Sequence, residues 1–246
     1  MRAIFTFHSI DNKDSVISCL PRYLAMLLGE LAARNIPVLS LGMLLESGTR
    51  KGVSITFDDG MKSVYQNALP IIREYGIPAH MFLATDAIDS DRLWPRNAGV
   101  GPTFDMLNWK ELEKLHENGV LIESHTHTHP DMRTLTVAQL EDECGSADNI
   151  VARRLGRRPE YFAYPFGFHN KMVRDFVRSR YEGAVTTELR QLGMIEDTAA
   201  LPRLDTYYLQ SRMFIRHIDS MVMRGYLELR NILRTLKGSQ CVADCD

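Results

Sequence analysis

Residues 53–84 read VSITFDDGMKSVYQNALPIIREYGIPAHMFLA, and this stretch decides the fold class. It begins with an apolar, β-prone segment over 53–57 and ends with a second one over 79–84. Between them, residues 62–75 carry apolar side chains at helical spacing, and Gly76 marks the end of that helix. A strand, a helix and a strand in this order predict two parallel strands joined by a crossover helix.

The same alternation of strands and helices runs through most of the chain. Further strands are expected over residues 3–8, 36–41, 120–124, 161–165 and 183–187, and further helices from Pro21, over 109–118, from the Thr136 cap to Leu155 and near 170–180. Repeated strand–helix units predict an α/β fold with a parallel sheet. The order and the length of 246 residues favour a (β/α) barrel over an open sheet, although the sequence alone leaves closure open.

The C-terminal part of the chain has a different pattern. After Tyr208 the apolar residues predict one long helix. They are Met213, Phe214, Ile218, Met221 and Leu229. Because neither a repeat nor a Gly/Ser-rich linker separates two domains, we expect one domain over 1–207 and a helical extension over 208–246 packed on it.

Composition and charge exclude several classes of protein. The chain is 45% hydrophobic and 24% charged, which is ordinary for a globular protein and excludes a collagen-like, disordered or coiled-coil chain. A net charge of −2 gives no sign of nucleic-acid binding. No apolar run approaches the roughly 20 residues of a membrane helix, and the opening MRAIFTFHSI lacks the cleavage site of a signal peptide. A cytoplasmic protein without a transmembrane segment is therefore expected.

The four cysteines of the chain are too widely spread for a disulfide framework. Cys241 and Cys245 could chelate a metal. Two thiols in a C-terminal tail are more often unpaired, so the sequence assigns them no function.

Two neighbouring carboxylates stand at the end of the strand over 53–57. Asp58 and Asp59 lie in the sequence TFDDG, directly before Gly60. Active sites of parallel α/β proteins lie at the carboxyl ends of the strands, where adjacent side chains can reach one pocket. A turn with two solvated acids explains this motif equally well when it is taken alone.

Three histidines follow the strand over 120–124. His125, His127 and His129 alternate in SHTHTHP. An extended chain would place all three on one side, whereas a turn or a helix start would bring His125 and His129 together. Histidine is the commonest transition-metal ligand, and two histidines with one carboxylate form a frequent open catalytic site. A polar loop with incidental histidines is the less favoured alternative, because three of the eight histidines fall within five residues.

A third motif, FAYPFG over 162–167, also follows a strand, but aromatic–proline turns are common wall elements and the motif is weak when taken alone. The long connection over 86–108 is of a length that often covers a functional site.

In this order the three motifs resemble those of the polysaccharide deacetylase family of carbohydrate esterases, family 4, which share the NodB-homology domain. The matching segments are ITFDDG over 55–60, SHTHTHPDM over 124–132 and FAYPFG over 162–167, with FTFHSI over 5–10, WKEL over 109–112 and LPRL over 201–204. The resemblance covers residues 1 to about 207. It implies a distorted (β/α) barrel of about seven parallel strands and metal-dependent removal of N-acetyl groups from N-acetylhexosamine units of a polysaccharide or its precursor.

The resemblance also implies roles for single residues. Asp59, His125 and His129 would hold a divalent metal ion, zinc first, although cobalt, nickel or iron also suit such a set. His127 falls at a variable position of the motif and is left out of the ligand set. Asp58 would be the general base that deprotonates the attacking water. Tyr164, Pro165 and Phe166 would wall the sugar site, and a backbone N–H near Phe166 would help to hold the oxyanion.

Two departures from the family pattern concern the groups around the base. Many members have an arginine where this chain has Ala163, and Arg203 is the best available arginine to pair with Asp58. Many members also have a late Leu-x-His that supplies the general acid, which this chain lacks. The chain resembles instead the branch that acts on exopolysaccharides such as poly-N-acetylglucosamine, in which an early aromatic–His pair is thought to provide the acid.

That pair is Phe7-His8, so His8 is expected to be the acid and to lie across the metal site from Asp58. The alternatives are a core or turn histidine at position 8 and a purely structural ion pair for Arg203.

Two other functions remain open on the sequence. The same metal-dependent hydrolysis could act on another amide, such as a formylated amino sugar on a lipid carrier or a cyclic amide. A catalytically inactive glycan-binding homologue is the third possibility, and the complete set of motif residues argues against it. An N-acetylated glycan is the expected partner, and the sequence gives no oligomeric state.

Overall fold

The computed structural model describes residues 1–90, 94 and 103–243, with the backbone alone after residue 233. Its strands are β1 (Arg2–Phe7), β2 (Gly52–Asp59), β3 (Ala79–Leu83), β4 (Val120–Ser124), β5 (Tyr161–Ala163), β6 (Gly183–Val185) and β7 (Leu204–Asp205). Its α-helices are α1 (Pro21–Ala33), α2 (Leu41–Leu45), α3 (Leu69–Tyr75), α4 (Trp109–Glu117), α5 (Val137–Leu155), α6 (Lys171–Arg180), α7 (Arg212–Arg216) and α8 (Met221–Ala243).

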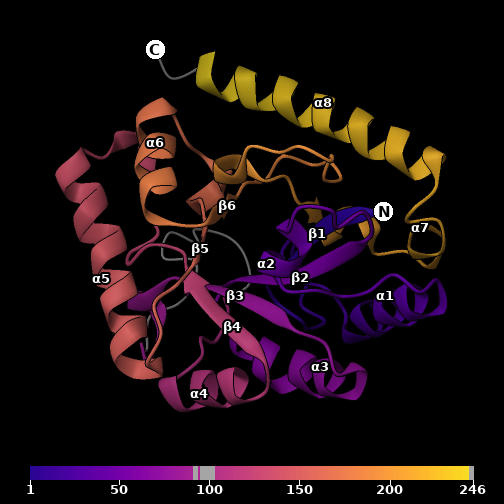
Figure 1. The fold of residues 1–246 in the computed structure, drawn as a ribbon, viewed down its shortest axis with the longest axis horizontal. Coiled ribbons are helices and arrows are strands. Elements are labelled where there is room, and N and C mark those ends of the chain that lie inside the picture. Colours follow the sequence, from indigo (N-terminus) through magenta and orange to yellow (C-terminus); the bar gives the residue numbers. More distant parts are fainter. Residues whose placement is uncertain (91–93, 95–102, 244–246) are drawn as a thin grey trace.

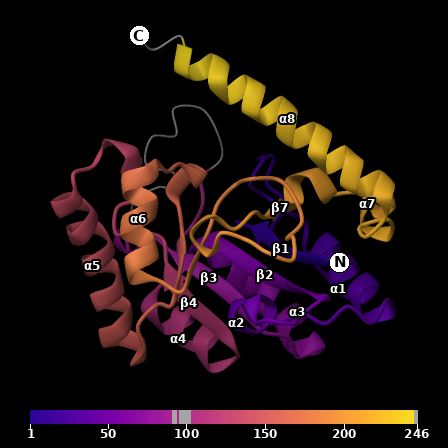
Figure 2. The ribbon, with the colours of Figure 1, turned by 45° about the horizontal axis from the view of Figure 1, so that its top comes forward.

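Within these ranges the seven strands form one parallel sheet in the order β6-β5-β4-β3-β2-β1-β7. The sheet curls, and helices α1, α3, α4, α5 and α6 form a ring outside it (Figure 1). The expected distorted (β/α) barrel of about seven parallel strands with a C-terminal helix is confirmed. Figure 2 shows the same ring from a second direction, with α8 on the side of the molecule away from α3 and α4.

A single segment connects the two edges of the sheet. Leu201 forms a parallel bridge with Val185 at the end of β6, and three residues later β7 begins and pairs with β1. The segment over 201–205 therefore brings Arg203 between the two edges, directly before β7. The sequence pattern did not predict β7, because a strand of two residues carries no periodicity.

The strand expected over residues 36–41 is wrong. Only Val38 bridges to Val53, and Leu41 already begins α2. The Ser40 hydroxyl accepts a hydrogen bond from the Met43 N–H, and this cap starts the helix before a strand can develop. The helix expected over 62–75 is confirmed, and residues 64–68 within it form a π-helical turn just before Pro70, which has no N–H to donate.

The predicted long C-terminal helix is broken into α7 and α8 by residues 217–220. The Ser220 hydroxyl accepts a hydrogen bond from the Met223 N–H and starts α8. Residues Ile215, Ile218, Met223 and Leu227 join the main core, whereas Met213, Met221 and Leu229 are exposed. None of the described helices is long and apolar enough to span a bilayer. The side chain of Cys241 and all of Cys245 lie outside the described residues.

The inside of the barrel contains a buried polar cluster centred on Glu123 of β4, whose side chain is fully buried. Its Oε2 accepts hydrogen bonds from the N–H groups of Glu160 and Tyr161, at 2.8 and 3.1 Å. Its Oε1 lies 3.2 Å from Nδ1 of His80, and Nε2 of that histidine accepts from the Leu41 N–H at 2.9 Å. Glu123 thus connects β4 to β3, β5 and α2.

Replacing Glu123 with alanine is expected to lower the free energy of unfolding by about 3–5 kcal/mol, because the change leaves buried donors without an acceptor. Urea denaturation measures this loss. Glu117→Ala, at an exposed position of α4, is the control and should change stability by less than about 0.5 kcal/mol. A Glu123→Ala protein as stable as the control variant would contradict this role.

Candidate active site and metal centre

The three sequence motifs meet at one edge of the barrel. Asp59 ends β2, His125 follows β4 and Tyr164 follows β5, and parallel strands bring their carboxyl ends to the same edge. A cavity of about 520 Å³ opens there. It is lined by His8, Ile17, Asp58, Asp59, Trp94, His125, Thr128, His129, Tyr164, Phe166, Gly167, Thr187 and Arg203.

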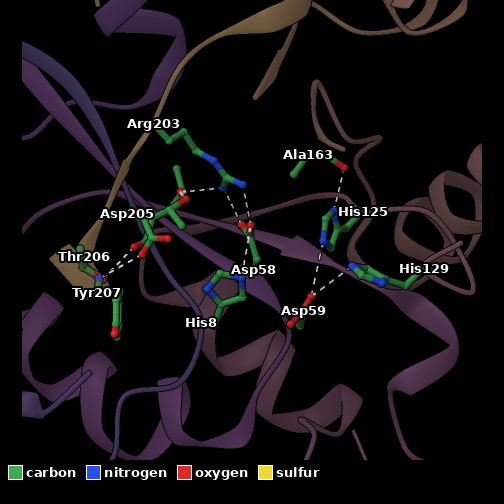
Figure 3. A network of polar contacts seen from close by, with 12 residues as sticks. His8, Asp58, Asp59, His125, His129, Ala163, Arg203, Asp205, Thr206 and Tyr207 are labelled. Carbon is green, nitrogen blue, oxygen red and sulfur yellow. Dashed lines mark hydrogen bonds and ion pairs between the residues drawn. The ribbon is translucent and has the colours of Figure 1, made fainter. Parts of the chain in front are cut away.

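Asp59, His125 and His129 form a compact group of metal-ligand type (Figure 3). One donor atom from each lies within 4.8 Å of the others. Oδ1 of Asp59 is 3.4 Å from Nε2 of His125 and 3.7 Å from Nε2 of His129. His127 points elsewhere, with Nδ1 2.9 Å from the Thr85 hydroxyl. Of the two arrangements that the sequence left open, the structure therefore has the turn that pairs His125 with His129.

The backbone of this turn is bent and firmly held. Thr126 and His129 have φ values of 65° and 59°, in the left-handed region that few residues other than glycine adopt. Glu143 of α5 accepts hydrogen bonds from the N–H groups of His127 and Thr128, at 3.0 and 2.8 Å. These charge-assisted bonds stabilise the bend that brings the two outer histidines together. No local sequence pattern indicates this role of Glu143, which lies farther along the chain within a helix pattern.

His125 is oriented by a backbone group. Its Nδ1 donates to the carbonyl of Ala163 at 2.7 Å, since a carbonyl oxygen can only accept. This bond directs Nε2 towards Asp59, and in the neutral tautomer that donates from Nδ1 this second nitrogen has a free lone pair, as is usual for a histidine that binds a metal. Ala163 thus contributes through its main chain, at the position where many family members have an arginine.

Arg203 and Asp58 form a buried bidentate ion pair. Both residues are 2% exposed, and Nη1 and Nη2 of Arg203 lie 2.7 Å from Oδ1 and Oδ2 of Asp58. Burial alone would raise the pKa of Asp58, but the charge and hydrogen bonds of Arg203 hold it below the ordinary value. The structure therefore brings together the two residues that the sequence predicts to pair, and Asp58 stays ionised.

The charge balance of the site leaves one carboxylate for a cation. Arg203 neutralises Asp58, whereas among the described residues Asp59 has no lysine or arginine partner. Burial would lower the pKa of His125, but its hydrogen bond to Asp59 and the charge of Asp58 raise it. Burial and the neighbouring His125 lower the pKa of His129 to about 4. A buried, negatively charged oxygen beside two imidazole nitrogens fits a divalent transition-metal ion.

His8 lies in the cavity, but not where it was expected. Its Nε2 is 3.9 Å from Oδ2 of Asp58, so it is beside Asp58, and its expected position across the metal site is wrong. The reason is strand register. Phe7 of β1 pairs with Phe57 of β2, so the residues that follow them, His8 and Asp58, are neighbours. Figure 3 shows His8 and Arg203 both next to Asp58.

The three residues expected to wall the sugar site differ in burial and in whether they line the cavity. Tyr164 is almost fully buried and donates its hydroxyl to the carbonyl of Ala199 at 2.8 Å. Pro165 is buried and does not line the cavity. Phe166 is 54% exposed, and its ring centroid lies 4.6 Å from that of His129. Phe166 is therefore the residue of this motif that presents an apolar face to a ligand.

The connection over 86–108 reaches the site through Trp94, whose indole N–H donates to Oδ2 of Asp59 at 3.0 Å. Residues 91–93 and 95–102 of this predicted cover lie outside the described residues.

Residues 46–180 match the family model described as polysaccharide deacetylase. A curated relative, poly-beta-1,6-N-acetyl-D-glucosamine N-deacetylase of Staphylococcus aureus (strain MRSA252), is 26% identical over 171 residues, which cover 65% of this chain and 53% of the relative. The chain spans about half the length of the curated relatives it matches.

Two solved structures share the fold. Streptococcus pyogenes deacetylase PplD in complex with acetate has a TM-score of 0.74 at 20% identity, covering 89% of this chain and 97% of that one. IcaB from Ammonifex degensii has a TM-score of 0.72 at 20% identity, covering 87% and 96%. Because the matching family model spans more than half of the sequence, this chain belongs to the polysaccharide deacetylase family.

Proposed function

We propose that the chain is a metal-dependent hydrolase that removes N-acetyl groups from N-acetylhexosamine units of a polysaccharide or its precursor. One observation carries the proposal: two adjacent buried carboxylates have different partners in one cavity. Asp58 is paired with Arg203, whereas Asp59 groups with His125 and His129. Metal-dependent amide hydrolysis uses a ligand set that holds the metal and a base that stays free of it. The different partners of Asp59 and Asp58 suit these two roles.

Asp59, His125 and His129 would hold the ion through Oδ1 and the two Nε2 atoms. A divalent ion held there would polarise the acetyl carbonyl and lower the pKa of a coordinated water towards neutrality. The buried position of the site strengthens these electrostatic effects, because little solvent screens them.

Asp58 is the proposed base. Its carboxylate takes a proton from the attacking water as the new C–O bond forms. Arg203 fixes both oxygens of Asp58 in place, so the base needs no reorganisation when the substrate binds. The amide C–N bond then breaks, and His8, which lines the cavity beside Asp58, is the proposed donor of a proton to the departing nitrogen. The products are acetate and a free amine on the sugar.

Phe166 is the proposed sugar-binding platform, because its exposed ring lies beside His129. An aromatic face is suited to the apolar face of a pyranose ring and would place the acetamido group over the ligand set. The name of the Staphylococcus aureus relative favours a β-1,6-linked N-acetylglucosamine polymer as the first substrate to test.

A panel of defined amides tests this function. The zinc-loaded protein is incubated with β-1,6-linked N-acetylglucosamine oligomers, with N-formylated amino sugars and with a cyclic amide. We expect acetate and free amine in equal amounts from the oligomers alone. Formate release or ring opening without acetate release would move the function to another amide. A protein that binds zinc and oligomer but cleaves none of the three would contradict hydrolysis altogether.

His8→Ala is expected to lower kcat on N-acetylglucosamine oligomers by roughly 10²–10⁴-fold with metal content unchanged, because an amine is a poor leaving group unless it is protonated. The same variant should keep most of its activity on p-nitrophenyl acetate, whose phenolate leaves without a proton. Acetate release and p-nitrophenol absorbance give the two rates. Equal losses of rate on both substrates, or no loss on either, would show that His8 is not the acid.

A further inference from the structure

We propose that Trp94 is a positioning residue of the metal site, which holds Asp59 so that a single carboxylate oxygen is offered to the ion. This inference rests on the proposed metal-dependent function and goes beyond it, because it assigns different tasks to the two oxygens of one ligand. It concerns a residue outside the three sequence motifs.

The two oxygens of Asp59 have different surroundings. Oδ1 lies 3.4 and 3.7 Å from the Nε2 atoms of His125 and His129. Oδ2 accepts the indole N–H of Trp94 at 3.0 Å. One oxygen therefore faces the point where the three donor groups converge, and a buried hydrogen bond engages the other.

Trp94 also contacts a second member of the ligand group. Its ring meets that of His129 edge to face, with centroids 5.3 Å apart and an interplanar angle of 77°. Trp94 itself is held in place, because its carbonyl accepts from the Phe104 N–H at 3.1 Å. A small apolar cluster surrounds the indole, formed by Met61, Ala84, Ala87, Phe104 and Met106.

The burial of Trp94 argues against a role as a sugar platform. Trp94 is 5% exposed, whereas Phe166, whose ring also contacts that of His129, is 54% exposed. A stacking platform must present a ring face to the ligand, which Phe166 does and Trp94 does not. The indole is therefore placed to act on the ligand group and not directly on the sugar.

The physical effect is control of carboxylate orientation. A carboxylate can bind a metal through one oxygen or both, and its side-chain torsion is soft when nothing holds it. The N–H of Trp94 fixes this torsion and uses lone-pair capacity of Oδ2, so that Oδ1 is left as the ligand atom. Loss of a hydrogen-bonding partner of this kind typically weakens metal binding by about 10–100-fold.

Trp94→Phe isolates the N–H, because it keeps an aromatic ring and removes the donor. The matched control is Trp109→Phe, since Trp109 is the other tryptophan of the chain and packs in the main core away from the site. Zn²⁺ affinity is measured by competition with a chelator, and the absorption spectrum is recorded at saturating Co²⁺. We expect Trp94→Phe to bind Zn²⁺ about 10–100-fold more weakly and to show a changed Co²⁺ spectrum, as a second oxygen joins the ion. Trp109→Phe should match the natural protein in both.

The saturated Co²⁺ spectrum separates positioning from a general loss of stability, because it reports only on molecules that are folded and loaded. A Trp94→Phe protein with natural affinity and spectrum would overturn the inference and leave the proposed function intact. Failure of the natural protein to bind Zn²⁺ or Co²⁺ would overturn the metal site and this inference together.

A second measurement does not depend on the folding of Trp94→Phe. In the Trp109→Phe protein, Trp94 is the sole tryptophan, so its fluorescence reports on the indole alone. One equivalent of Zn²⁺ should change the emission, because the hydrogen-bond acceptor of the indole acquires a cation on its other oxygen. An emission spectrum unchanged by stoichiometric Zn²⁺ would contradict the contact.

Discussion

His125→Ala and His129→Ala are each expected to lose most of the bound metal and, with it, the hydrolytic activity. Each change removes one of three donor atoms that lie within 4.8 Å of one another, and a three-ligand site tolerates such a loss poorly. Metal content after dialysis, measured by elemental analysis, and acetate release from N-acetylglucosamine oligomers give the two readouts. We expect both to fall together in both variants.

His127→Ala is the matched control for metal content, since it removes a histidine from the same turn. His127 contacts Thr85 and not the ligand group, so this variant should retain a full equivalent of metal. Unchanged metal in both His125→Ala and His129→Ala, or loss of metal in His127→Ala alone, would contradict the ligand set.

Asp58→Asn is expected to keep its metal and to lose turnover by at least about a hundredfold. The amide has nearly the shape of the carboxylate and can still accept one hydrogen bond from Arg203, but it cannot take a proton from water. The kcat on N-acetylglucosamine oligomers and the metal content are the measurements. Because Asp58 is paired with Arg203 and does not belong to the ligand group, the two readouts should separate.

The control for Asp58→Asn is Asp175→Asn, which makes the same chemical change at an exposed position of α6. It should leave kcat and metal content unchanged. If the Asp58→Asn protein has lost its metal, Asp58 would be a metal ligand and Asp59 the base. Near-natural turnover with full metal would assign the base to another group.

The meeting of the motifs at one edge could be predicted from local patterns and one general rule, whereas the choice of Asp59, His125 and His129 as ligands came from the family resemblance. Each motif directly follows an apolar strand, and parallel strands bring their carboxyl ends to one edge. Because Asp59 ends one strand and His125 follows another strand of the same parallel sheet, both are expected at that edge. The pairing of Arg203 with Asp58 came from the resemblance and from a search for a substitute arginine, because no local pattern connects residues so far apart.

Other features depend on long-range contacts that leave no periodic signal. The two residues of β7 form a strand only because the segment over 201–205 passes beside β1. Glu143 and Trp94 lie in a helix and in a long connection, and nothing in their neighbours' sequence indicates contact with the histidine turn or with Asp59. The position of His8 could have been predicted, since adjacent parallel strands of matching register place the residues that follow them side by side.

The proposed hydrolase depends on an ion held by Asp59, His125 and His129, and anomalous X-ray diffraction of zinc-soaked crystals tests this site most directly. We predict one strong peak at the zinc edge, about 2.0–2.2 Å from Oδ1 of Asp59 and from Nε2 of both histidines, with Asp58 still paired to Arg203. A peak bound to Asp58 or His127, or no peak in this cavity in crystals of a protein that binds zinc in solution, would contradict the account.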